Sequence, residues 1–270
     1  SLSNEAGSGP NHAAMAAWVK DFDITRPLHY EPAMGSPNKE GYIDPSNPAY
    51  LKSNDHSHRI QNPLDQYYVD VISRMYPALY TAPLLANQKN DDKRPIFFCE
   101  YAHAMGNSCG NLTDFWNQWK NTPRIIGGCI WEFKDQGLLK KDSEGHSYFA
   151  YGGDYGEKYF DNFTIKGIVT PDGIPKSPMY ECKRIFQPIQ CSINKGNLVI
   201  ENNSASVNTG IYDVTITITK NGQLVYTHPL KNIFVLPNSS LKNFTHSFPS
   251  LFIKFALNHS HHWSYFSRDP

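Results

Sequence analysis

The sequence lacks a surplus of charge of either sign, because 25 Lys and Arg residues balance 25 Asp and Glu residues among 270. Nucleic-acid binding needs a surplus of positive side chains that displaces counterions from phosphates. No basic run is longer than the pairs Lys140-Lys141 and Lys183-Arg184. Long hydrophobic runs are absent too, since the stretch 95–99 is far shorter than the roughly 20 apolar residues that span a bilayer. We therefore expect neither a nucleic-acid partner nor a membrane span.

Cysteine is scarce, odd in number and without CxxC spacing. We expect five free thiols, with a bridge between Cys182 and Cys191 as the alternative: Cys99, Cys109, Cys129, Cys182 and Cys191. Free thiols favour a cytoplasmic protein, although the compartment stays open. The chain begins without an initiator Met or a charged and then apolar leader, so we expect either a removed leader or an internal piece of a longer chain.

Hydrophobic residues make up 40% of the chain and aromatic residues 13%, which is enough for a packed core. Two apolar runs, 95–99 and 125–131, flank residues 111–120, where large apolar side chains recur at helical spacing. Strong helix formers predict a further helix at 11–20, with Asn11 as its N-cap. Alternating strands and helices are typical of parallel βα units. We expect an α/β domain over residues 1–186, with a long loop at 32–63.

The pattern changes to alternating apolar and polar residues after this domain. Residues 212–219 and 223–226 flank Asn221-Gly222, which predicts a hairpin of half-buried strands. We expect a partial, all-β immunoglobulin-like sandwich at 187–238. Residues 239–270 are rich in Ser, Phe, His and Asn without clear periodicity, and they predict an unstructured tail.

Polar side chains follow the apolar runs of the first domain, where parallel βα folds collect their ligands. Glu5 and Glu100 each stand directly after such a run. Two carboxylates on separate strands suit glycoside hydrolysis, in which one protonates the leaving oxygen and the other attacks the sugar carbon. Tyr76, Tyr101 and Trp131 would supply flat aromatic faces for sugar rings.

Each of these residues also has a purely structural interpretation. A Glu after a strand is often a cap or a salt-bridge partner, which applies to Glu5. His103 on its own suits a hydrogen-bonded core histidine, and Trp131 suits a core position. Cys99 has no basic neighbour in sequence that would activate its thiol, so we interpret it as a core residue.

Four segments together resemble glycoside hydrolase family 2, and within it the enzymes that act on β-galactosides. They read SLSNEAGSG at 1–9, RPIFFCEYAHAMGNS at 94–108, GGCIWEFKDQ at 127–136 and YGGDYG at 151–156. The second segment is the longest and most specific. The resemblance extends to about residue 190, and more loosely through the sandwich that follows.

The resemblance implies an α/β TIM barrel of which this chain holds strands four to eight, at 1–5, 28–31, 69–76, 96–100 and 125–131. It implies roles for six residues: Glu5 as general acid/base, Glu100 as nucleophile, Asn4 at the sugar 2-hydroxyl, Tyr76 and His103 at the nucleophile and the sugar hydroxyls, and Trp131 as the floor of the sugar pocket. The implied reaction removes terminal β-D-galactose from β-galactosides such as lactose by a retaining double displacement.

The resemblance also implies two metal ions. Glu5 is the only position identified here as a magnesium ligand. A sodium ion would lie near the galactose site, but Lys166 stands where the family has Asn, and its ammonium either replaces the charge of that cation or abolishes the site. Ser3 and Ala6 also depart from the family pattern, which has Gly and Ser there.

Several alternatives follow from the same residues. The chain could belong to a family 2 enzyme that acts on glucuronides or mannosides, or to a truncated sugar-binding protein without turnover. Strands one to three of the implied barrel are absent, so we expect the isolated chain to be inactive. The full-length protein would bind a small glycoside, with a homo-oligomer as a further expectation.

Overall fold

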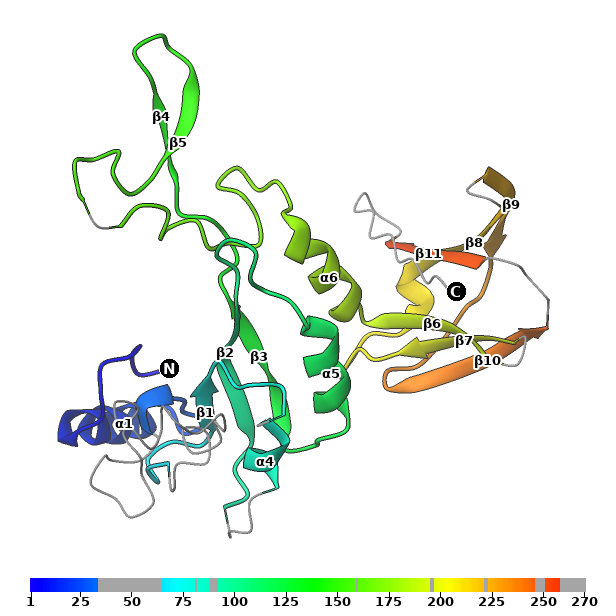
Figure 1. Cartoon of the computed structure of the whole chain (residues 1–270). Coiled ribbons are helices and arrows are strands. Elements are labelled where there is room, and N and C mark those ends of the chain that lie inside the picture. Colours follow the sequence, from blue (N-terminus) through cyan, green and yellow to red (C-terminus); the bar gives the residue numbers. More distant parts are fainter. Residues whose placement is uncertain are drawn as a thin grey trace. The chain divides into compact units, whose positions relative to one another are not determined.

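A computed structural model describes residues 1–33, 65–80, 82–87, 92–158, 160–194, 197–220, 223–245 and 251–257. The chain divides into two compact units, Ser1–Glu181 and Cys182–Pro270 (Figure 1). The boundary falls inside helix α6 (Ser177–Ile185) rather than after residue 186. Most of the loop expected at 32–63 lies outside the described residues. In the described part of the chain, no helix is both long and apolar enough to cross a membrane.

Unit 1 is built on a parallel sheet with the strand order β1-β2-β3 (Figure 1). Its elements are α1 (Pro10–Phe22), η1 (Glu31–Ala33), β1 (Ile72–Met75), α4 (Ala82–Ala86), β2 (Ile96–His103), α5 (Leu112–Lys120) and β3 (Ile125–Trp131). A hairpin of β4 (Leu138–Lys141) and β5 (Ser147–Ala150) follows. The strands expected at 69–76, 96–100 and 125–131 are therefore confirmed.

Two segments that precede β1 in the sequence extend this sheet beyond β1, although neither forms a regular strand. His29 forms a parallel bridge with Val71, just before β1. The Leu2 N–H in turn donates to the His29 carbonyl at 3.1 Å. The prediction of strands at 1–5 and 28–31 is therefore wrong in detail, although both segments take the expected places in the order. Among the described residues, the three strands form an open sheet and not a closed barrel.

Helix α5 covers one face of the sheet through stacked aromatic rings. Trp119 stacks on Phe98 with 5.3 Å between ring centroids, and it meets Tyr101 edge-on at 4.9 Å. Gly128 on β3 permits this close packing, because a Cβ there would lie 2.6 Å from the Phe98 carbonyl oxygen and 3.1 Å from the Trp119 ring. Tyr101 is therefore a core residue, and its predicted place at the aromatic rim of the site is wrong.

A register shift in β2 explains the position of Tyr101. The pairing of β2 with β1 skips one residue of β2, since Arg74 is opposite Phe98 and Met75 is opposite Glu100. Residues three apart in a regular strand point to opposite faces, yet Phe98 and Tyr101 both contact Trp119. The shift leaves Glu100, between them, on the side of Tyr76.

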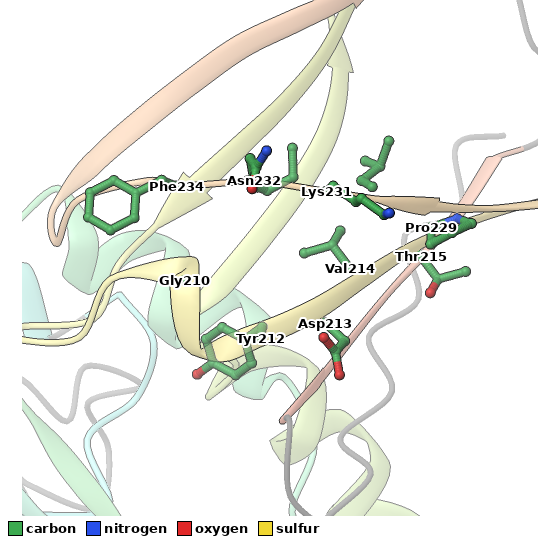
Figure 2. A pocket seen from close by; sticks show the side chains of 11 residues that line it. Gly210, Tyr212, Asp213, Val214, Thr215, Pro229, Lys231, Asn232 and Phe234 are labelled. Atoms are coloured by element: carbon green, nitrogen blue, oxygen red, sulfur yellow. The ribbon is translucent and has the colours of Figure 1, made fainter.

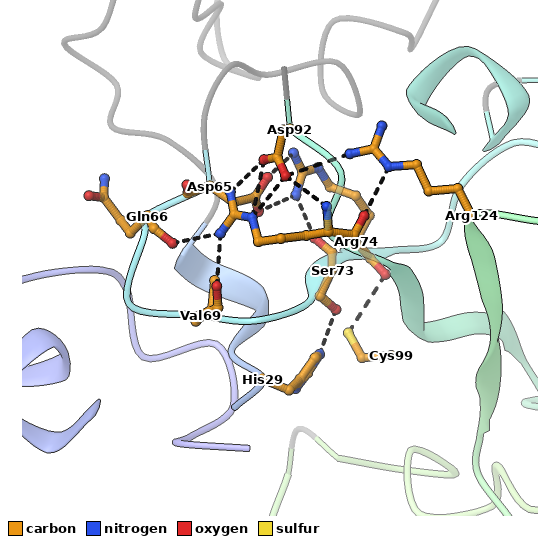
Figure 3. A network of polar contacts seen from close by, with 10 residues as sticks. His29, Asp65, Gln66, Val69, Ser73, Arg74, Asp92, Cys99 and Arg124 are labelled. Carbon is orange, nitrogen blue, oxygen red and sulfur yellow. Dashed lines mark hydrogen bonds and ion pairs between the residues drawn. The ribbon is translucent and has the colours of Figure 1, made fainter. Parts of the chain in front are cut away.

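A buried ion-pair network holds β1 in place (Figure 3). Arg74 is 2% exposed, and its two terminal nitrogens donate to the two carboxylate oxygens of Asp65 at 2.7 and 3.0 Å. Arg94 donates to the carbonyls of Gln66 and Val69, both at 2.9 Å. Buried charges need such complete pairing because water no longer solvates them. The network therefore fixes the strand that leads into Tyr76.

Helix α1 begins one residue earlier than predicted. Pro10 is its first residue and Gly9 its N-cap, in place of Asn11. Proline suits the first turn, since its missing N–H would have no helical partner there and its φ is already helical.

Unit 2 consists of two three-stranded antiparallel sheets with the orders β10-β7-β6 and β11-β8-β9. Its elements are β6 (Ile189–Asn194), β7 (Asn197–Asn202), η2 (Thr209–Ile211), β8 (Tyr212–Lys220), β9 (Gln223–Leu230), β10 (Ser239–Thr245) and β11 (Leu251–Leu257). Side chains of β6, β7, β8 and the segment after β9 share one core: Ile189, Leu198, Ile200, Val214, Ile216, Ile233 and Val235. The predicted β8–β9 hairpin is confirmed, while its turn at 221–222 lies outside the described residues.

The stretch after residue 238 differs from the expectation of an unstructured tail. Strand β10 pairs with β7, and strand β11 pairs with β8 along its whole length. Residues 246–250 and 258–270 lie outside the described residues. The immunoglobulin-like topology of unit 2 stays a prediction. All five cysteines are free thiols, and no bridge joins Cys182 and Cys191.

Candidate functional site

Tyr76 and Glu100 form the centre of the candidate site. Tyr76 directly follows β1, and its hydroxyl donates to Oε2 of Glu100 on β2. Glu100 is 9% exposed. Burial, together with this hydrogen bond and the charge of Glu100, raises the pKa of Tyr76 well above its usual value. Tyr76 therefore keeps its proton at neutral pH and stays a hydrogen-bond donor to a carboxylate.

Glu5 lies in the first segment of unit 1, after Leu2, and is exposed. Its charge is a further, smaller cause of the raised pKa of Tyr76. Glu5 and Tyr76 both have left-handed backbone, with φ values of 48° and 47°. Side chains other than glycine rarely adopt this conformation, and it persists where the surrounding structure imposes it.

The turn that carries Glu5 is anchored on the neighbouring segment. Tyr30 is fully buried, and its hydroxyl donates to the Gly7 carbonyl. The His12 ring stacks on Tyr30 at 4.5 Å, and its Nε2 lies 2.8 Å from the same hydroxyl. On the other side of Glu5, Leu2 is bonded to His29, as described above. These contacts fix both ends of the turn.

His103 and Trp131 complete the edge of the sheet. They are partners in the register of β2 and β3, at the carboxyl ends of both strands. The His103 ring lies 5.9 Å from the Tyr76 ring. Four of the six predicted residues are thus connected on the parallel sheet: Tyr76, Glu100, His103 and Trp131. Asn4 precedes Glu5 in an exposed bend, and no contact joins it to the others in the described structure.

Lys166 adds a positive charge next to this edge. Its side chain is 5% exposed, and Nζ lies 5.1 Å from the centroid of the Trp131 ring and 4.4 Å from that of Phe163. Sequence reasoning did not select Phe163 as a site residue. One feature of the sequence indicates that Phe163 could belong to the site. It stands three residues before Lys166, and Lys166 departs from the family pattern.

Magnesium stays a prediction for the full-length protein. Glu5 is the only predicted ligand, and no group of three or more His, Cys, Asp or Glu side chains that could hold a metal ion occurs among the described residues. One carboxylate does not make a magnesium site, which normally takes six oxygen ligands. We therefore assign no chemical step to this ion.

A cavity of about 580 Å³ lies in unit 2, between β8, the end of β9 and the segment that follows (Figure 2). Asp213 and Lys231 are the charged residues of its lining. None of the predicted site residues belongs to unit 2. None of the residues that line the cavity is a predicted site residue.

Comparison with known proteins agrees with the geometry of unit 1. The family described as "Glycosyl hydrolases family 2, TIM barrel domain" matches residues 1–191. A β-galactosidase of Vibrio cholerae is 37% identical over 208 residues, which is 75% of this chain and 18% of that protein. A β-galactosidase of Leuconostoc mesenteroides is 34% identical over 86% of this chain and 21% of its own length.

A third relative extends through unit 2. The β-galactosidase of Psychromonas ingrahamii is 32% identical over 276 aligned residues, which cover 98% of this chain and 25% of that protein. The chain thus spans between about a sixth and a quarter of the length of the curated relatives that it matches. Since the family match covers well over half of its residues, and since the matched region carries the edge described above, the chain belongs to glycoside hydrolase family 2.

Proposed function

We propose that this chain forms part of a longer retaining β-galactosidase, in which Glu100 is the nucleophile and Glu5 the general acid/base. The hydrogen bond from Tyr76 to Glu100 is the observation that carries the proposal. A buried carboxylate with a single fixed donor keeps one orientation, as a nucleophile requires. The similarity to β-galactosidases supports the choice of substrate.

In the first step, a Glu100 carboxylate oxygen attacks the anomeric carbon of the galactoside, and the bond from this carbon to the leaving oxygen breaks. Glu5 gives its proton to that oxygen, so the aglycone leaves as a neutral alcohol. Tyr76 holds Glu100 through the hydroxyl proton. Trp131 offers a flat apolar face to the sugar, while Asn4 and His103 would bind its hydroxyls.

In the second step, water attacks the anomeric carbon of the galactosyl ester. Glu5, now a carboxylate, takes a proton from the water, and the bond to Glu100 breaks. Both carboxylates return to their starting states, and the sugar leaves with its original β-configuration. Retention of this kind needs carboxyl groups about 5–5.5 Å apart.

The full-length protein that contains this chain is the material for the test. We would incubate it with a 2-deoxy-2-fluoro galactoside that has a good leaving group and then map the adduct by mass spectrometry. We expect a covalent label on Glu100 and loss of turnover in Glu100→Gln. Glu144→Gln is the matched control, since Glu144 is exposed in the turn between β4 and β5. A label on another residue would contradict the assignment.

Assays of the full-length protein distinguish galactoside, glucuronide and mannoside as substrates, and they distinguish an enzyme from a sugar-binding protein. A panel of nitrophenyl β-galactoside, β-glucuronide and β-mannoside identifies the sugar that is turned over. Preference for either of the last two would replace galactoside as the substrate. Binding of a sugar without turnover or label would identify a sugar-binding protein.

A further inference from the structure

Among the residues that the structure describes, Lys166 is a buried cation with no anionic partner. Buried lysines are normally paired with a carboxylate, because desolvation of a lone charge is unfavourable. In the part of the chain that the structure describes, no ion pair or hydrogen bond involves the Lys166 ammonium. Its ammonium lies over the faces of Trp131 and Phe163. Such cation–π contacts attract the ammonium but leave its N–H donors unused.

The backbone around Lys166 holds this cation in a fixed place. The Glu132 N–H donates to the Lys166 carbonyl at 2.9 Å. The Gly167 N–H donates to Oδ1 of Asp135 at 2.6 Å, and Lys176 pairs with the same carboxylate at 3.0 Å. The segment lies so close to its neighbour that a Cβ on Gly167 would come within 2.2 Å of the Asp135 nitrogen. The ammonium is therefore positioned next to Trp131 by the fold itself.

These side chains do not fit the sodium ion that the family resemblance implies at this position. Hard cations such as sodium take oxygen ligands, whereas Lys166 places an ammonium here, against the rings of Trp131 and Phe163. A metal ion beside the ammonium would also meet strong like-charge repulsion in a poorly solvated place. The positive charge is thus already supplied by the chain.

We propose that the Lys166 ammonium takes the place of a bound sodium ion in this protein and donates hydrogen bonds to an oxygen substituent of the sugar that rests on Trp131. This inference rests on the proposed function, because it takes Trp131 as the floor of the sugar site. It makes Lys166 a residue that binds substrate, and it makes sugar binding independent of sodium.

The first test measures binding of isopropyl 1-thio-β-D-galactoside, which is not hydrolysed, to the full-length protein by calorimetry. Sodium is replaced by choline at constant ionic strength. We expect the same Kd in both salts. A Kd that is about tenfold lower in sodium would overturn the proposal. If the panel above identifies another sugar, its thioglycoside is used, so failure of the galactosidase assignment and failure of this inference are distinguishable.

The second test removes the charge. In Lys166→Met we expect the Kd or KM for the sugar to rise about tenfold or more, with a smaller change in kcat, since a hydrogen bond from a charged donor is lost. Lys134→Met is the matched control, because Lys134 is exposed on the neighbouring segment. Unchanged sugar affinity in Lys166→Met would contradict the proposal.

A third test does not depend on activity. Crystals of the full-length protein grown in rubidium chloride give an anomalous signal wherever a monovalent cation binds. We expect no peak beside Trp131 and Phe163 in the wild type. A peak at that position would show that a metal ion binds despite Lys166, and it would overturn the proposal.

Discussion

The Tyr76 hydroxyl donates a hydrogen bond to Oε2 of Glu100, although 24 residues separate the two in the sequence. The contact joins the residue that directly follows β1 to a residue within the neighbouring parallel strand β2. It links the proposed nucleophile to a donor that a buried ion-pair network holds in position through Arg74.

Replacement of Tyr76 by Phe removes the donor and leaves the ring. We expect kcat/KM of the full-length protein for nitrophenyl β-galactoside to fall about ten- to hundredfold, because a hydrogen bond to a charged group is lost. Tyr148→Phe is the control, since Tyr148 is exposed on β5. Equal rates for Tyr76→Phe and wild type would contradict the positioning role.

The hydrogen bond between Tyr76 and Glu100 should also affect how the free energy of unfolding depends on pH. Burial first, and then Glu100, raise the pKa of Tyr76 above the unfolded value of about 10. The protonated hydroxyl therefore stabilises the fold fully below about pH 10, and this contribution is lost as the pH rises towards the folded pKa. Urea unfolding of wild type and Tyr76→Phe should differ by a constant amount at lower pH and converge above about pH 10. A difference that grows in alkali would disagree with this sign.

Glu5→Gln should separate the two chemical steps. Without a proton donor, we expect kcat for lactose to fall about 10²- to 10⁴-fold. A dinitrophenyl galactoside needs little protonation to leave, so its first step should be less affected. Azide should restore turnover by replacing activated water and should yield β-galactosyl azide. Equal losses for both substrates, without rescue, would argue against an acid/base role.

Asp65→Asn should lower the free energy of unfolding, because it breaks the ion-pair network that holds β1. It leaves Arg74 buried beside a neutral side chain, and breaking such a pair costs about 3–5 kcal/mol of unfolding free energy. Urea unfolding measures the change. Asp21→Asn in α1 is the control and should have little effect, because Asp21 is exposed. A similar unfolding midpoint for both variants would contradict the prediction.

Gly128→Ala should weaken the packing of α5 on the sheet. Its Cβ would collide with the Phe98 carbonyl, which is backbone and cannot turn away. We expect a loss of about 1–3 kcal/mol in thermal or urea unfolding. Gly110→Ala has open space around its Cβ and should unfold at nearly the wild-type midpoint. Comparable losses in both would indicate a general effect of removing glycine.

The sequence by itself determined the order of the parallel segments, the helix at α5, the β8–β9 hairpin and the family. These features depend on local periodicity and on contiguous motifs, such as the residues from Arg94 to Ser108. The candidate site was predicted from the same motifs, since the carboxyl ends of parallel strands meet at one edge of a sheet, and the roles of Glu5 and Glu100 stay a prediction.

The tertiary structure alone decided which face each side chain occupies. A register shift in β2 turns Tyr101 into the core and leaves Glu100 facing Tyr76, because β2 has one extra residue against β1 between Phe98 and Glu100, and one extra residue reverses the alternation of a strand. Strands β10 and β11 form where composition suggested none, since pairing with β7 and β8 supplies partners that local sequence does not reveal. The place of Lys166 over Trp131 likewise depends on a contact between two segments 35 residues apart. Such contacts arise from packing between distant parts of the chain, which no local pattern encodes.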